Sequence, residues 1–82
     1  MCRNITELRG LEPPATTEEI EAAARQYVRK VSGFTRPSSA NAEAFEVAVA
    51  EVAATTTRLL DNLPARRQPP KADPPLRRLA TR

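Results

Sequence analysis

Histidine is absent from this 82-residue chain, cysteine occurs once, and glycine only twice. Without histidine a Ser-His-Asp triad cannot form, and one cysteine allows neither a disulfide framework nor a conventional structural zinc site. The two isolated glycines exclude a Gly-rich phosphate-binding loop. No apolar run approaches the ~18–20 residues of a membrane-spanning helix, and the N-terminal part lacks a signal-peptide core. We therefore expect a soluble cytoplasmic protein with no cofactor, no metal site and no membrane contact.

Charge and proline are distributed unevenly along the chain. Residues 1–63 contain seven basic and nine acidic groups, a net charge of −2, whereas residues 64–82 contain six basic groups and one acidic group, a net charge of +5. The second stretch also contains five of the eight prolines. Because proline removes backbone donors and prevents a continuing helix, the sequence predicts a small helical domain over 1–63 and an extended or disordered basic tail over 64–82.

The first predicted helix covers 17–32. Thr16 and Glu19 form a Thr-x-x-Glu capping box, and Gly33 is a natural left-handed stop. The apolar face has a helical period and consists of Ile20, Ala23, Ala24, Tyr27, Val28 and Val31.

The second predicted helix begins at one of three competing caps, Ser38, Ser39 or Asn41, and runs to about Asn62 before Pro64. Its predicted core face consists of Phe45, Ala48, Val49, Val52, Ala53, Thr56, Leu59, Leu60 and Leu63. Since the connector is short, the two helices should form an antiparallel hairpin. A short helix over 4–9 should place Ile5, Leu8 and Leu11 against it. The predicted fold is all-α: a hairpin, a short N-terminal helix and an extended Pro-rich tail.

Three surfaces and one thiol are candidates for function. A basic stripe of Arg25, Arg29, Lys30 and Arg36 could dock an acidic protein surface, or could be a solvated face in which Glu21 pairs with Arg25. A second stripe on the second helix consists of Val47, Ala50, Ala54 and Thr57. It is either covered by the N-terminal segment or forms a helix–helix interface, including one in a homodimer.

The tail cations are Arg66, Arg67, Lys71, Arg77, Arg78 and Arg82. Basic arms of this kind bind RNA, DNA phosphates or acidic proteins through salt-dependent contacts, although this arm lacks the aromatic side chains that stack on single strands. The alternative is a solubilising tail. Cys2 is either a reactive or chelating thiol or a small buried hydrophobe, and no second cysteine or histidine is present to activate it.

Three strings resemble a family of short bacterial proteins known as a domain of unknown function. They are Met1-Cys2-Arg3-Asn4-Ile5, Leu11-Glu12-Pro13-Pro14-Ala15-Thr16 and Tyr27-Val28-Arg29-Lys30-Val31-Ser32-Gly33. The resemblance implies a small cytoplasmic bacterial protein and no assigned activity.

A weaker, architectural resemblance is to the J-domain of co-chaperones. Ala15-Thr16-Thr17-Glu18-Glu19-Ile20 looks like the start of its second helix, and Phe45 and Leu59-Leu60-Asp61 match its third. Where a J-domain carries His-Pro-Asp, this loop reads Arg36-Pro37-Ser38, so no stimulation of a chaperone ATPase is expected.

The sequence therefore predicts a non-catalytic protein-interaction module or adaptor. The alternative is a protein that binds ribosomes or nucleic acid through its tail. A redox or metal role for Cys2 is a more distant alternative.

Overall fold

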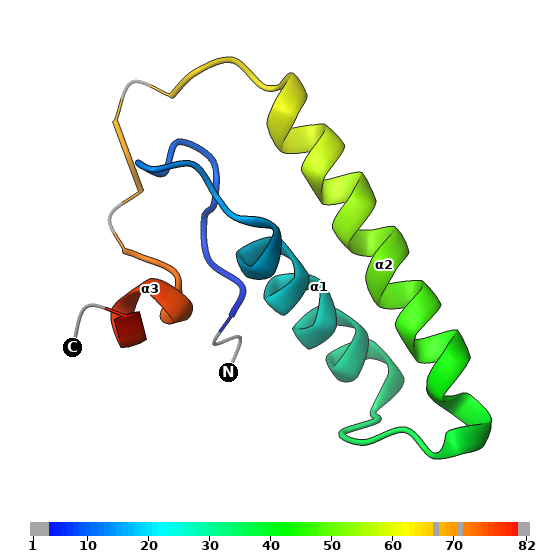
Figure 1. The fold of residues 1–82 in the computed structure, drawn as a ribbon. Coiled ribbons are helices and arrows are strands. Elements are labelled where there is room, and N and C mark those ends of the chain that lie inside the picture. The colour runs from blue at the N-terminus through cyan, green and yellow to red at the C-terminus, as the bar shows by residue number, and fades with distance from the viewer. Residues whose placement is uncertain (1–3, 67, 71, 81–82) are drawn as a thin grey trace.

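The computed structural model describes residues 4–66, 68–70 and 72–80. Its three helices are α1 (Thr17–Ser32), α2 (Ser39–Asn62) and α3 (Pro75–Ala80). Two long helices, α1 and α2, form the antiparallel hairpin, and the tail returns along the far side of α1 to end in α3 (Figure 1). The predicted all-α fold and the hairpin are confirmed. No described helix is long and apolar enough to span a membrane.

Local sequence determines both ends of α1. The Thr16 hydroxyl accepts a hydrogen bond from the Glu19 N–H at 3.1 Å, and the Thr16 N–H donates to the Glu19 carboxylate at 2.8 Å. This capping box satisfies two backbone donors that the first turn would leave unpaired. At the other end, Gly33 adopts φ 78° and donates its N–H to the Arg29 carbonyl. The predicted bounds of α1 are thus confirmed.

Of the three competing caps, Ser38 is the N-cap of α2, although its side chain makes no capping hydrogen bond to the helix backbone. Within the second half of α2, the hydroxyls of Thr56 and Thr57 donate to the carbonyls one turn earlier, at 2.8 and 2.9 Å. These bonds keep polar groups satisfied within the helix. The helix ends at Asn62, before Pro64, as predicted.

The core between the two helices is small. Its buried members are Ile20, Ala24, Val28, Phe45, Val49 and Ala53, all from the two predicted apolar faces. Four residues assigned to those faces by periodicity are exposed instead: Tyr27, Val31, Leu59 and Leu63. They lie at the edges of the predicted faces or near helix ends. The expectation that they are core residues is wrong.

The predicted helix over 4–9 is also wrong, because residues 4–9 form turns and irregular structure and no helix. Asn4 donates its backbone N–H to Gln26 instead of capping a helix. The segment still packs as expected at two of its three apolar positions, since Leu8 touches the core and Leu11 is buried, whereas Ile5 is exposed. The resemblance to a J-domain stays a prediction, and residues 4–9 do not form the short first helix that it implied.

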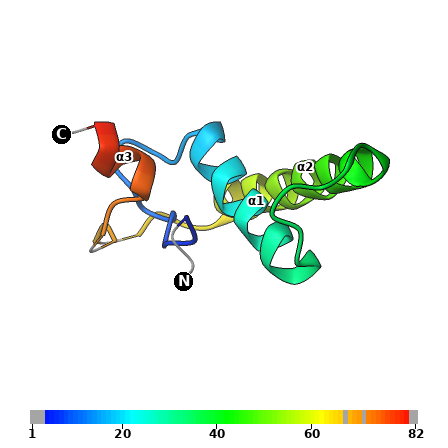
Figure 2. The same ribbon diagram turned by 90° about the horizontal axis from the view of Figure 1, so that it is seen from below.

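The tail is not extended throughout. Residues 75–80 form α3, whose first residue is Pro75, a favoured residue at a helix start. Figure 2 shows α3 beside the loop that leads into α1. The short third helix of the fold is therefore formed by the C-terminal tail and not by the N-terminal segment.

Candidate functional site

Three of the four predicted docking cations lie exposed at the tip of the hairpin. Arg29 and Lys30 belong to the last turn of α1, and Arg36 to the loop before α2. Among the described residues, no carboxylate lies within ion-pair distance of any of the three. Val31, 65% exposed, and Phe34, 40% exposed, lie among them. The tip therefore combines positive charge with apolar surface, which suits an acidic protein partner.

Arg25, the fourth cation, is used within the hairpin. Its two terminal nitrogens donate to the two carboxylate oxygens of Glu46 on α2, at 2.7 and 2.9 Å. Its guanidinium also lies 5.9 Å from the centre of the Phe45 ring. The hydrogen bond with Glu46 raises the pKa of Arg25 and lowers that of Glu46. Because Arg25 pairs across the hairpin instead of with Glu21, we define the tip patch as Arg29, Lys30 and Arg36.

Two tail cations, Arg66 and Arg77, are bound to the body instead of projecting from it. Arg66 donates to the Glu7 carboxylate at 2.9 Å, and Arg9 donates to the Pro64 carbonyl at 3.1 Å. The backbone comes so close here that a Cβ on Gly10 would lie 2.8 Å from the Cβ of Arg66. Residues 64–66 thus run against residues 7–10 as a strap.

Of the two tail ion pairs that the described residues form, that of Arg77 from α3 is the more buried. Arg77 donates to both oxygens of Glu19, at 2.8 and 3.2 Å, and to the carbonyls of Pro13 and Pro14, at 2.6 and 3.0 Å. Burial alone would raise the pKa of Glu19, but the hydrogen bonds from Arg77 and from the Thr16 backbone outweigh it, and the pKa is lowered. The other tail cations fall outside the described side chains: Arg67, Lys71, Arg78 and Arg82.

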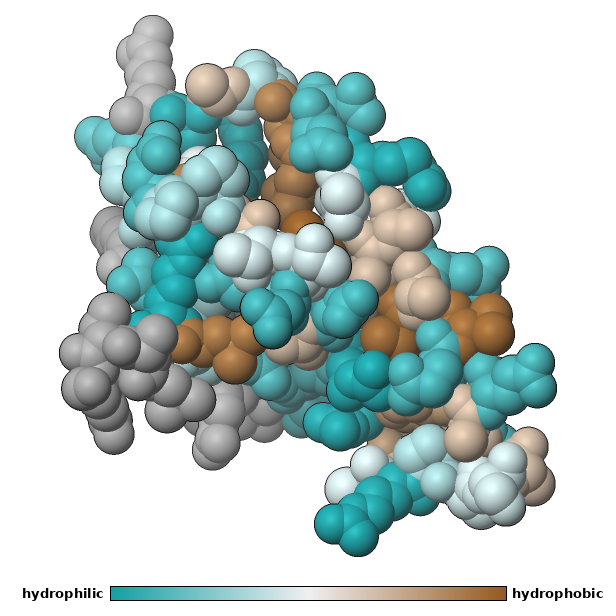
Figure 3. Space-filling model, in the orientation of Figure 1, coloured by the Kyte–Doolittle hydropathy of each residue, from teal (hydrophilic) through white to brown (hydrophobic). Residues whose placement is uncertain are grey.

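The second predicted stripe is exposed on α2. Val47 is 50% exposed, Ala50, Ala54 and Thr57 are exposed as well, and the described part of the N-terminal segment, from Asn4 on, leaves them uncovered. Figure 3 shows hydrophobic side chains reaching the surface over α2 and again near α3, separated by hydrophilic ones. The predicted helix–helix interface on this stripe stays a prediction, and Cys2 lies outside the described residues.

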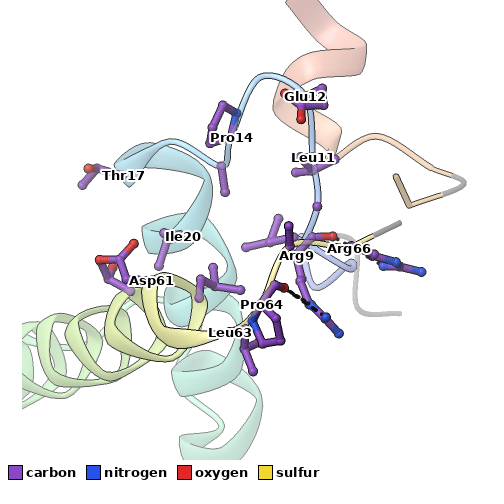
Figure 4. Close-up of a pocket in the computed structure, with 16 residues that line it drawn as sticks. Arg9, Leu11, Glu12, Pro14, Thr17, Ile20, Asp61, Leu63, Pro64 and Arg66 are labelled. Atoms are coloured by element: carbon purple, nitrogen blue, oxygen red, sulfur yellow. Dashed lines mark hydrogen bonds between the residues drawn. The ribbon is translucent and has the colours of Figure 1, made fainter. Parts of the chain in front are cut away.

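One cavity, of about 330 Å³, lies where the loop before α1 meets the end of α2. Leu11, Ile20 and Leu60 supply apolar walls, and Glu12 and Asp61 lie at its edge. Figure 4 shows the guanidinium groups of Arg9 and Arg66 directed away from this space.

A second cavity, of about 320 Å³, lies between α1, α2 and the N-terminal segment. A third, of about 470 Å³, continues it along the hairpin; the two share Tyr27, Val52 and Thr56. We call this continuous space the hairpin groove. The hydroxyl of Thr6, which lines the second cavity, is buried with no hydrogen-bond partner among the described residues. Sequence periodicity missed the groove because it assigned Tyr27 to the core.

The described residues contain no group of three or more side chains of the types that hold a metal ion. The exposed tip patch, the strap with the Arg77 contact, and the hairpin groove are thus the features that distinguish this small helical protein. A family model described as an uncharacterized conserved protein, DUF2277, matches residues 1–82. The chain belongs to that family, as the resemblance predicted. No curated protein and no solved structure matches it.

Proposed function

We propose that the protein is a non-catalytic interaction module whose hairpin tip docks an acidic protein surface. The observation that carries this proposal is the tip patch, in which three exposed cations form no ion pair among the described residues, whereas Arg25 forms one with Glu46. Unpaired charge of one sign raises the rate of encounter with oppositely charged partners, and adjacent apolar side chains supply contact area.

Binding to ribosomes or nucleic acid through the tail has less support. Arg66 and Arg77, the two tail cations whose side chains the structure describes, both pair with carboxylates of the body. Cations already paired within the protein release fewer counterions when they meet phosphate, so they contribute less to nucleic-acid affinity.

The test compares three full-length proteins as baits in native lysate, washed at low and high salt. They are the wild type, the triple variant Arg29→Ala, Lys30→Ala, Arg36→Ala, and a matched control, Arg58→Ala, which removes an exposed cation of α2 outside the tip patch. A partner retained by the wild type and the control but lost by the triple variant supports the proposal. Because the three side chains are exposed and unpaired, unfolding free energies should agree within about 0.5 kcal/mol.

A partner that binds the triple variant as well as the wild type contradicts the proposal. Recovery of ribosomes or nucleic acid by all three baits, only at low salt, favours the tail alternative instead.

A further inference from the structure

The start of α1 holds one guanidinium group among four acceptors. The Arg77 Nε–H donates to one carboxylate oxygen of Glu19 at 2.8 Å, and Nη2 donates to the other at 3.2 Å. Nη2 also donates to the carbonyls of Pro13 and Pro14, at 2.6 and 3.0 Å. Two N–H donors side by side on one carboxylate are a geometry that a guanidinium makes and an ammonium does not. We call the Glu19 carboxylate with the Pro13 and Pro14 carbonyls the arginine cradle.

Residues of the body hold the arginine cradle in shape. The Thr16 N–H donates to the Glu19 carboxylate at 2.8 Å, which fixes that carboxylate within the capping box. The side chain of Glu19 is only 4% exposed, and the rings of Pro13 and Pro14 fix the φ angles of the two residues that supply the carbonyls. All of these constraints lie within residues 13–19, so we expect the cradle to keep its geometry when the tail leaves.

The tail is attached to the body mainly by polar contacts. The core cluster and the side chains packed on it all come from residues 8–60, so the described part of the tail contributes to neither. Besides the bonds of Arg77, the hydrogen bonds that join the described tail to the body are exposed ones between residues 64–66 and 7–10. Pro74 is the only buried residue of the described tail. A segment held in this way opens at a smaller free-energy cost than the helices that form the core.

The tail also shows which ligand the cradle takes. The Arg77 backbone N–H donates to the Pro74 carbonyl at 3.0 Å, so one turn that begins at a buried proline presents the guanidinium. Once the tail leaves, Glu19 loses the only cation that bonds to it among the described residues. Because a buried carboxylate without a cation is unfavourable, an empty cradle favours the entry of another guanidinium.

We propose that the arginine cradle is a guanidinium-binding site that the tail occupies reversibly, and that an arginine of another protein fills it when the tail is released. The partner segment that fits is a short turn in which a proline precedes the arginine by three positions, as Pro74 precedes Arg77. The cradle lies at the first turn of α1 and the tip patch at its last turn and beyond. This inference therefore does not depend on the proposed docking function.

The first experiment follows the Arg77 Nε–H of the isotope-labelled full-length wild type by nuclear magnetic resonance. Hydrogen exchange of this group requires Arg77 to leave the cradle, whereas exchange of the Ala24 and Val49 amides requires the core of the hairpin to open. A tail that is open in about 0.1–10% of molecules protects the Nε–H about 10- to 1000-fold. We expect this protection to be about tenfold or more below that of the two core amides.

Two matched variants test the contribution of Glu19. Glu19→Gln keeps an acceptor for the Thr16 N–H and should lower the protection of the Arg77 Nε–H by about tenfold or more, because the charged acceptor is lost. Glu18→Gln removes the same charge from an exposed side chain in the same turn and should leave this protection unchanged.

The second experiment adds ethylguanidinium to full-length Arg77→Ala, from about 1 to about 100 mM at constant ionic strength, a range that detects weak ligands. The backbone resonances of Thr16 and Glu19 should shift and saturate. Ethylammonium carries the same charge without the planar fork, and should bind about tenfold more weakly or less. In the wild type Arg77 competes for the cradle, so ethylguanidinium should also bind there about tenfold more weakly.

Two results would overturn the proposal. Equal protection of the Arg77 Nε–H and the core amides would mean that the tail leaves only when the whole protein unfolds. Equal responses of Arg77→Ala and the wild type, or equal responses to the two cations, would mean that the cradle is a fixed internal contact that takes no other guanidinium. The first measurement uses the wild type alone, so it decides against a reversible tail even if Arg77→Ala does not fold.

Discussion

Arg77 holds the tail onto the start of α1, and its removal gives the most informative test of the fold. Its guanidinium contacts the Glu19 carboxylate twice and two backbone carbonyls of the loop before α1. Arg77→Ala deletes all four contacts while leaving the Thr16 capping box of α1 in place.

The expected loss follows from the burial of the pair. The side chains of Arg77 and Glu19 are 16% and 4% exposed, so the substitution leaves a buried carboxylate without its cation. Breaking one side of a buried ion pair typically costs about 3–5 kcal/mol. Glu19 retains the hydrogen bond from the Thr16 N–H, and water reaches it once α3 departs. We therefore expect Arg77→Ala to lower the free energy of unfolding by about 2 kcal/mol, near the value for a hydrogen bond to a charged group.

Urea unfolding followed by circular dichroism measures this loss. A double-mutant cycle with Glu19→Gln, which keeps an acceptor for Thr16, isolates the coupling between the two side chains. Arg66→Ala is the matched control: it breaks a tail pair with Glu7 that is 30% and 68% exposed, and should cost less than about 1 kcal/mol. If Arg77→Ala costs no more than Arg66→Ala, the buried pair of Arg77 and Glu19 contributes no more than an exposed ion pair, and the reasoning fails.

Three further predictions concern the same fold. Gly10→Ala and Gly33→Ala both place alanine in a left-handed conformation, at φ 85° and 78°, which costs about 1–2 kcal/mol. Only at Gly10 does the new Cβ also meet Arg66, so Gly10→Ala should lower the free energy of unfolding more. Equal losses in urea unfolding would show that the contact with Arg66 contributes nothing. Because its pKa is lowered from the ordinary 4.5, the ionised Glu19 carboxylate stabilises the fold at pH values above 4.5. The free energy of unfolding should be flat from about pH 6 to 8, should fall as the pH drops below 4.5, and should fall less in Glu19→Gln. An equal fall in Glu19→Gln would argue against this contribution of Glu19. Phe45→Ala should cost about 3–5 kcal/mol and unfold much of the protein at 25 °C, as ellipticity would show; a variant that keeps full helix content would mean that the Phe45 ring contributes little.

The parts of the fold that local chemistry determines could be predicted from the sequence. The capping box at Thr16 and Glu19, the stop at Gly33 and the stop before Pro64 each depend on residues within a few positions, and both ends of α1 and the end of α2 follow from them. The predicted helix over 4–9 failed because the packing of Leu8 and Leu11 against the hairpin outweighs a weak local preference.

Contacts between distant segments could not be predicted in the same way. Arg77 pairs with a residue 58 positions away, and Arg25 pairs with Glu46 across the hairpin instead of with its helical neighbour Glu21. Net charge treats all tail cations as equivalent, whereas the fold binds two of them to the body. One local signal was present: Pro75 followed by Leu76 and two arginines matches a helix that begins with proline.

The tail carries positive charge and also binds to the body through Arg66 and Arg77, so a test of its function must separate these two roles. Cutting the chain after Leu63 removes both Arg66 and Arg77, so a shortened protein should be less stable than Arg77→Ala, and any loss of binding would not separate charge from folding. Full-length variants that neutralise Arg67, Lys71 and Arg82 but retain Arg66 and Arg77 separate the effect of charge from the effect on folding. If a nucleic-acid role is real, their affinity for a single-stranded RNA probe should fall and its dependence on salt should weaken. If affinity and salt dependence are unchanged, these three cations do not bind RNA. The tail then serves to hold Arg66 and Arg77 against the body, and partner binding is left to the hairpin.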